Sequence, residues 1–78
     1  MASAETMPRK PAHFAFLIAI RQSDGSDHVY AILAHSVDEA VRIAAAQEPE
    51  GPAPRHVGSL GSHTVKRIKL EIGEARII

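Results

Sequence analysis

The chain of 78 residues contains no cysteine and no tryptophan, and its nine basic residues are balanced by nine acidic ones. Without cysteine there is neither a disulfide framework nor a thiolate metal site, so packing or a partner must stabilise the fold. The absence of cysteine also fits a reducing compartment, and we expect a cytoplasmic protein. The zero net charge differs from the strongly basic balance that is typical of nucleic-acid-binding domains.

Long apolar runs are also missing. The longest one covers residues 12–20, whereas a membrane helix needs about 20 apolar residues, so we expect no membrane association. Basic residues precede this run as in a secretion signal, but no small-residue cleavage pattern follows it. We therefore interpret the run as a strand.

The length bounds the number of domains, because a chain this short cannot form two independent cores. Hydrophobic residues make up 45% of the sequence and charged residues 23%, which is typical of a chain that folds. Residues 1–12 contain two prolines and show no periodicity, and we expect a disordered leader there. Residues 13–78 are predicted to form a single α+β domain.

Two segments of matching length predict a hairpin. Residues 13–21 and 28–35 are rich in β-branched and aromatic side chains, which favour strands. Between them lies the polar, glycine-containing sequence Ser-Asp-Gly-Ser-Asp, which is typical of a hairpin loop. We expect the two strands to pair antiparallel.

A helix is predicted directly after the hairpin. Ser36 can cap its first turn, and Glu39 can reach back to the backbone N–H of Ser36. Pro49 should end it. The residues with helical spacing that would face the sheet are small or β-branched: Val37, Ala40, Val41, Ile43 and Ala44.

The second half of the chain has weaker signals. Residues 49–62 contain three prolines and three glycines and are interpreted as a long loop. Residues 67–72 alternate between apolar and charged side chains, which predicts a third strand with one wet face, and residues 75–78 fit a short fourth strand. The predicted fold is a small, mainly antiparallel sheet of three to four strands in the order β-β-α-β, with one helix packed on one face.

Both faces of the first two strands are apolar, although a single helix can cover only one of them. The other face would expose an apolar patch, and a second copy of the chain is the simplest partner that could cover it. The alternatives are that the leader and the long loop fold over this face, or that its alanines make the exposure tolerable. We expect a homodimer, with a different protein partner as the alternative, and the predicted interface residues are Phe14, Phe16, Leu17, Val29 and Leu33.

Basic residues concentrate towards the end of the chain and suggest a second function. They could contact the phosphates of nucleic acid, and the candidates are Arg55, His56, Lys66, Arg67 and Lys69. The competing interpretation is a charged strand face that discourages edge-to-edge aggregation. The few aromatic residues fit a core or an interface better than a stacking platform for bases.

Catalytic and metal-binding patterns are weak. No pair among the five histidines has the spacing of a recognised zinc site, and His13 and His28 could meet only if the hairpin register allowed it. No serine, histidine and acid follow a known catalytic pattern, and no cofactor is predicted. We expect a small non-enzymatic binding or accessory module that self-associates. Nucleic-acid binding is the first alternative, and a small enzyme or metal-binding protein is the further one.

Overall fold

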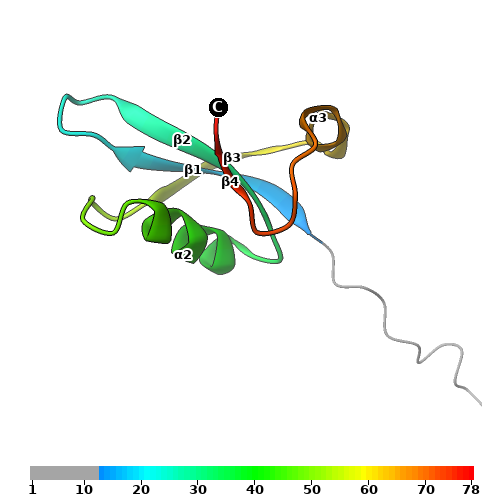
Figure 1. The fold of residues 1–78 in the computed structure, drawn as a ribbon, viewed down its shortest axis with the longest axis horizontal. Helices are drawn as coiled ribbons and strands as arrows, with labels where there is room; N and C mark the ends of the chain where they lie inside the picture. The colour runs from blue at the N-terminus through cyan, green and yellow to red at the C-terminus, as the bar shows by residue number, and fades with distance from the viewer. Residues whose placement is uncertain (1–12) are drawn as a thin grey trace, which may run out of the picture.

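The computed structural model describes residues 13–78, which form a four-stranded sheet with a helix on either side (Figure 1). The strands lie in the order β3-β1-β2-β4, and all three pairings of neighbouring strands are antiparallel. The predicted leader, residues 1–12, lies outside the described residues. The elements along the chain are β1 (Phe14–Arg21), β2 (Asp27–Ala34), α2 (Val37–Gln47), β3 (Arg55–Leu60), α3 (Ser62–Ile68) and β4 (Ala75–Ile77).

The hairpin of β1 and β2 confirms the predicted antiparallel pairing of the first two strands. Its register places Phe14 opposite Ala34. Gly25 in the connecting loop has a φ of 91°, a conformation that favours glycine. The Asp24 carboxylate accepts hydrogen bonds from the backbone N–H of Ser26 at 2.9 Å and from its hydroxyl at 2.6 Å. The loop therefore has a defined conformation that fixes the register of the two central strands.

Helix α2 begins where the sequence predicts it. The Ser36 hydroxyl accepts a hydrogen bond from the backbone N–H of Glu39 at 3.2 Å, as expected for a capping residue. The Glu39 carboxylate, however, accepts from the backbone N–H of His35 at 2.8 Å, so the prediction that it binds the N–H of Ser36 is wrong. The helix ends at Gln47, two residues before Pro49.

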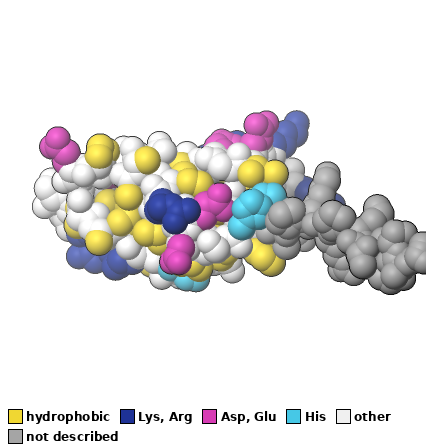
Figure 2. All heavy atoms as spheres, turned by 90° about the horizontal axis from the view of Figure 1, so that it is seen from below, with side chains coloured by type: hydrophobic (Ala, Val, Ile, Leu, Met, Phe, Trp, Pro, Cys, Tyr) yellow, Lys and Arg dark blue, Asp and Glu magenta, His cyan; other side chains and the backbone are white. Residues whose placement is uncertain are grey.

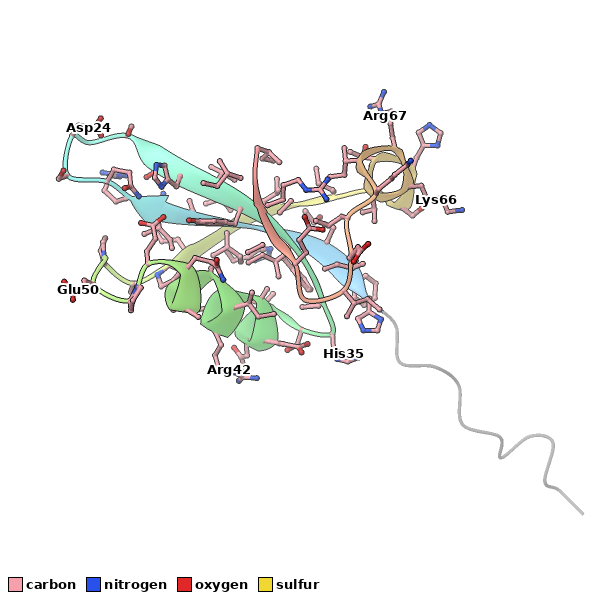
Figure 3. The ribbon with its side chains drawn as sticks, in the orientation of Figure 1. Asp24, His35, Arg42, Glu50, Lys66 and Arg67 are labelled. Carbon is pink, nitrogen blue, oxygen red and sulfur yellow. The ribbon has the colours of Figure 1, made fainter. Side chains whose placement is uncertain are left out.

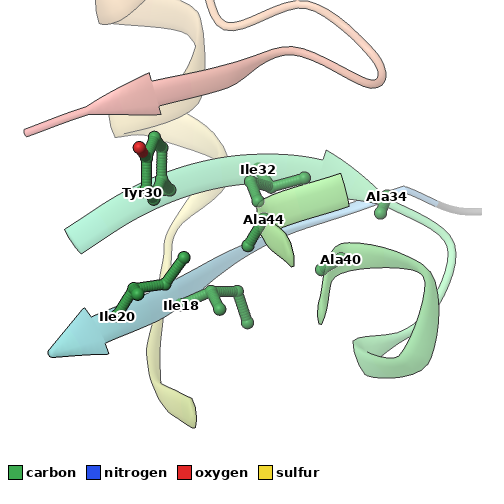
Figure 4. Close-up of a cluster of buried hydrophobic side chains, with 7 residues drawn as sticks. All are labelled: Ile18, Ile20, Tyr30, Ile32, Ala34, Ala40 and Ala44. Atoms are coloured by element: carbon green, nitrogen blue, oxygen red, sulfur yellow. The ribbon is translucent and has the colours of Figure 1, made fainter. Parts of the chain in front are cut away.

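The main core lies between α2 and the sheet face that it covers, called the front face below. The largest fully buried side chains are Ile18, Ile20 and Ile32, on the two central strands. Ala40 and Ala44 of α2 pack against them (Figure 4). Because these helix residues are small, α2 can lie close to the sheet, and the core is correspondingly thin.

The prediction of a loop over residues 49–62 is wrong in part. Residues 55–60 form β3, which pairs with β1 and has an irregularity in register between Leu17 and Ile18 of β1. Gly58 lies opposite Leu17, and a Cβ atom at this glycine would lie 3.5 Å from the Leu17 Cδ1. Of the prolines and glycines that indicated a loop, Gly58 lies within the strand and the others lie before or after it.

The prediction of a strand over residues 67–72 is also wrong. Residues 62–68 form α3, and Lys69 then adopts a left-handed conformation with φ 57° that turns the chain. The apparent alternation arises because Ile68 is the last helical residue and Leu70 follows the turn. Ile72 forms only an isolated bridge with Leu33.

The face opposite α2, called the back face, has its own small cluster. Leu70 is buried there with Ala15 and Ala31, and Val65 and Ile68 of α3 pack against them. The predicted helix on one face is α2, and the face that was expected to be bare is covered at this end of the sheet by α3, a second and shorter helix. β4 forms as predicted and pairs with β2, and the predicted α+β class with a small antiparallel sheet is confirmed. Neither α2 nor α3, the helices of residues 13–78, is long and apolar enough to cross a membrane.

Candidate functional site

One region of the back face stays uncovered by α3. The register places Leu17 of β1 beside Ala31 of β2, and in the next row Ala19 lies beside Val29. The backbone N–H of Ile78 donates to the carbonyl of Val29 at 3.0 Å, which continues this row at the edge of the sheet. Leu17 and Val29 are only partly buried and Ile78 is 59% exposed. Leu17, Val29 and Ile78 are called the open patch below.

Ion pairs border the open patch where the hairpin loop begins. The Asp27 carboxylate accepts hydrogen bonds from Arg21 Nε at 2.8 Å and from Arg55 Nη2 at 3.1 Å. These two guanidinium groups lower the pKa of Asp27 below its usual value, the Arg21 bond first and the Arg55 bond second. The border of the patch thus carries both signs of charge, because one carboxylate lies between two arginines.

The structure divides the predicted interface residues between the two faces. Leu17, Val29 and Leu33 share the back face, and the first two belong to the open patch. Phe16 packs against the front core, and Phe14, which is 55% exposed, lies next to it with 6.2 Å between the ring centroids. The five residues therefore do not form one surface.

The predicted basic surface is also divided. Arg55 lies at the start of β3, paired with Asp27, and the His56 ring packs edge-on against Phe16 with 5.6 Å between centroids. The other three candidates lie at the opposite end of β3 or beyond it, on α3 and at the residue that ends it: Lys66, Arg67 and Lys69.

A polar cluster at the end of α2 was not predicted from the sequence. Glu48 accepts hydrogen bonds from Gln22 Nε2 at 3.0 Å, from Tyr30 Oη at 2.8 Å, and forms a 2.9 Å contact with His28 Nδ1. The bonds from Gln22, His28 and Tyr30 lower the pKa of Glu48 to about 2. Burial, and then the bond to Glu48, raise the pKa of Tyr30.

The properties of this cluster fit a structural link between two elements of the fold. A general base works best with a pKa near the working pH, and the shifts move Glu48 and Tyr30 away from neutrality. The three side chains that contact Glu48 come from the hairpin, whereas Glu48 is the C-cap of α2, so the cluster links the end of the helix to the sheet. The sequence gives one signal for it: His28 and Tyr30 are two residues apart in a strand and therefore share a face.

Two histidines lie together at the other end of the hairpin. The rings of His13 and His35 have centroids 4.1 Å apart, and His35 Nδ1 lies 3.1 Å from Glu39 Oε1. The register predicts this pair, because His13 and His35 are the residues next to the Phe14 and Ala34 pair. His28 instead lies opposite Ile20, so the suggested meeting of His13 and His28 does not occur.

Metal binding has no supporting arrangement in this part of the chain. Within residues 13–78, no group of three or more histidine, aspartate or glutamate side chains is placed to hold a metal ion. The two histidines with acidic neighbours, His28 and His35, each contact a single glutamate.

A shallow cavity of about 210 Å³ lies between α3 and the sheet. Its lining is mostly apolar, and Ser62 and His13 are the lining residues that have polar side chains. The lining residues are His13, Phe14, Ala15, Leu33, Leu60, Ser62 and Val65. Small-molecule sites usually measure about 300–1,000 Å³, so this cavity suits one ring-sized group.

The charge on the α2 side of the molecule is mixed. Figure 2 shows basic, acidic and histidine side chains in small groups separated by hydrophobic ones, without a field of one sign. Comparisons of the chain with protein-family models, with curated proteins and with solved structures find no match.

Proposed function

We propose that this domain is a small non-enzymatic binding module that acts as a homodimer, with the open patch as the contact between the two copies. The observation that supports the proposal is the uncovered row of Val29 and Ile78 with Leu17 beside it. A contiguous apolar patch rimmed by charged groups is typical of a surface that binds protein. A cytoplasmic location belongs to the same proposal, and the cysteine-free composition is compatible with it.

The thin core gives a reason for association. Among residues 13–78, eleven hydrophobic residues are buried, and six of them are alanine. A domain of this size rarely gains more than about 3–5 kcal/mol from its own core, and burial of further apolar area in a dimer adds to this. Association of folded chains would therefore stabilise the fold as well as cover the patch.

A second copy is the favoured occupant because of the charges at the border. A two-fold axis brings the same patch of both copies together, so the charged groups at the border of one copy face the same charged groups of the other copy. A border of one sign would repel itself, whereas Asp27 between Arg21 and Arg55 offers each copy a group of the opposite sign. The mixed border therefore fits self-association.

Substitution of one patch residue tests the proposal. Val29→Lys places a charge in the open patch and should give a monomer in sedimentation velocity at concentrations where the unmodified protein is a dimer. Ile77→Lys is the matched control, because Ile77 is 54% exposed and pairs with Tyr30, a residue of the front core. This control variant should remain a dimer.

Circular dichroism of both variants checks that they are folded. The proposal is contradicted if the unmodified protein sediments as a monomer, if folded Val29→Lys remains a dimer, or if the control dissociates instead. A loss of structure in Val29→Lys is resolved with Leu17→Gln, a milder change in the same patch, which should also weaken the dimer.

A further inference from the structure

Helix α3 carries basic groups that no carboxylate neutralises within the described part of the chain. Lys66 and Arg67 occupy its last turn and Lys69 follows it. The ion pairs of lysine and arginine among residues 13–78 involve other residues, namely Arg21, Arg55 and Arg76. Figure 3 shows Lys66 and Arg67 projecting from α3, at the opposite end of the molecule from the acidic residues Asp24 and Glu50.

Lys69 occupies a backbone position that favours glycine. Its φ of 57° and ψ of 45° are left-handed, and the backbone N–H of Leu70 donates to the carbonyl of Val65 at 3.2 Å across the helix end. Helices that end in this way usually have glycine or asparagine at the left-handed residue. The turn requires a left-handed residue but not a lysine, so the side chain of Lys69 is a candidate for a binding role. The side chain in question adds a third cation to the end of α3.

The cavity of about 210 Å³ lies between α3 and the sheet. Ser62 and Val65 of α3 line it. Lys66 does not line the cavity itself, but it follows Val65 and lies one helical turn after Ser62, which places it on the helix face next to the cavity. The cavity offers apolar walls for a flat ring, with the Ser62 hydroxyl and the His13 imidazole available to polar atoms of that ring.

We propose that α3, Lys69 and the adjacent cavity form a binding site for single-stranded nucleic acid. Lys66, Arg67 and Lys69 contact its phosphates, and one unstacked base enters the cavity. A ligand for this site must carry negative charge and a flat, largely apolar group on one chain, and single-stranded nucleic acid carries both at every nucleotide. A duplex keeps its bases stacked, and an acidic peptide supplies charge without a base. The inference does not depend on the proposed dimer, because the cations are not part of the open patch.

Fluorescence anisotropy with a short labelled oligothymidine tests the site. Three phosphate contacts predict a slope of about −2 for log affinity against log salt concentration, because each contact to a single strand contributes about −0.7. An abasic strand of the same length keeps the phosphates and loses the bases, and we expect it to bind about tenfold more weakly. A duplex of the same sequence should also bind more weakly than the single strand.

Lys69→Gly separates a binding role from a structural one. Glycine relieves the left-handed conformation, so the melting temperature should rise by about 4 °C, whereas the affinity for the single strand should fall and the salt slope should lose about 0.7. Lys66→Gln should weaken binding by about three- to tenfold. Arg42→Gln is the matched control, because Arg42 is an exposed cation on α2, away from α3 in Figure 3, and this variant should bind as the unmodified protein does.

Several results would overturn the inference. These are no binding at low salt, equal binding of the abasic strand, and an affinity that Lys66→Gln and Lys69→Gly leave unchanged. Equal weakening by Arg42→Gln would reduce the effect to overall charge. Tighter binding of polyglutamate or of anionic lipid vesicles than of the single strand would assign the cations to a different class of partner.

Discussion

Replacing Leu70 with alanine tests whether the back cluster contributes to the stability of the fold. Leu70 is 6% exposed and is the large side chain buried over Ala15 and Ala31. The change removes about three methylene equivalents at about 0.8 kcal/mol each, and a site this close to the surface can partly collapse onto the space. We expect a loss of about 2–3 kcal/mol in the free energy of unfolding. For a domain of this size that corresponds to a fall of about 10–20 °C in melting temperature.

Urea unfolding followed by far-ultraviolet circular dichroism measures this loss. Ile72→Ala is the control, because Ile72 lies two residues away and is 65% exposed, and its replacement should change the free energy of unfolding by less than about 0.5 kcal/mol. If Leu70→Ala is as stable as the unmodified protein, or if the two variants lose equal stability, then α3 and Leu70 do not form a second core.

Three further outcomes follow from the hairpin and the Glu48 cluster. Hydrogen bonds lower the pKa of Glu48 from 4.5 to about 2, so its contribution to stability is complete above about pH 4.5 and is lost as the pH falls towards 2. The melting temperature of Glu48→Gln should therefore fall less steeply over this pH range than that of the unmodified protein. Equal falls in melting temperature would refute this role. Tyr30→Phe removes one donor to Glu48 and should cost about 1 kcal/mol in urea unfolding, with a rise in the Glu48 pKa that NMR titration can detect. Gly25→Ala forces alanine into a φ of 91° and should cost about 1–2 kcal/mol, whereas an unchanged stability would mean that the loop has a different conformation.

The first half of the fold could be predicted because its signals are local. The hairpin follows from two apolar segments around a glycine-containing loop, and α2 follows from Ser36 and the spacing of its apolar residues. The hairpin pattern lies within residues 13–35 and the helix pattern directly follows it, so contacts between distant parts of the chain did not need to be known. One detail was wrong, namely the partner of the Glu39 carboxylate. This partner is the backbone N–H of His35 instead of that of Ser36, and the choice depends on the backbone conformation just before the helix.

The second half depends on contacts that the sequence does not display. β3 contains Gly58, which weakens a strand by propensity, but the strand forms here because it pairs with β1. In α3, Val65 and Ile68 are the apolar residues with helical spacing. Ile68 belongs to the helix and Leu70 follows the left-handed turn at Lys69, yet in the sequence the two residues alternate with charged ones as in a strand. Tertiary packing decides both cases.

The candidate sites were predicted only in part for the same reason. Leu17 and Val29 share the open patch because the hairpin register puts them on one face, which the sequence could indicate. The separation of Arg55 from Lys66 and Arg67 follows from the direction of β3, and β3 was interpreted as a loop. The Glu48 cluster joins the hairpin to the end of α2 and needs the three-dimensional structure.

The solution mass of the unmodified protein tests the proposed homodimer most directly. Light scattering at two protein concentrations distinguishes a chain of 8.4 kDa from a dimer of about twice that mass. The proposal predicts the dimer mass at the higher concentration, and a decrease only on strong dilution. A mass of one chain at both concentrations would contradict self-association through the open patch.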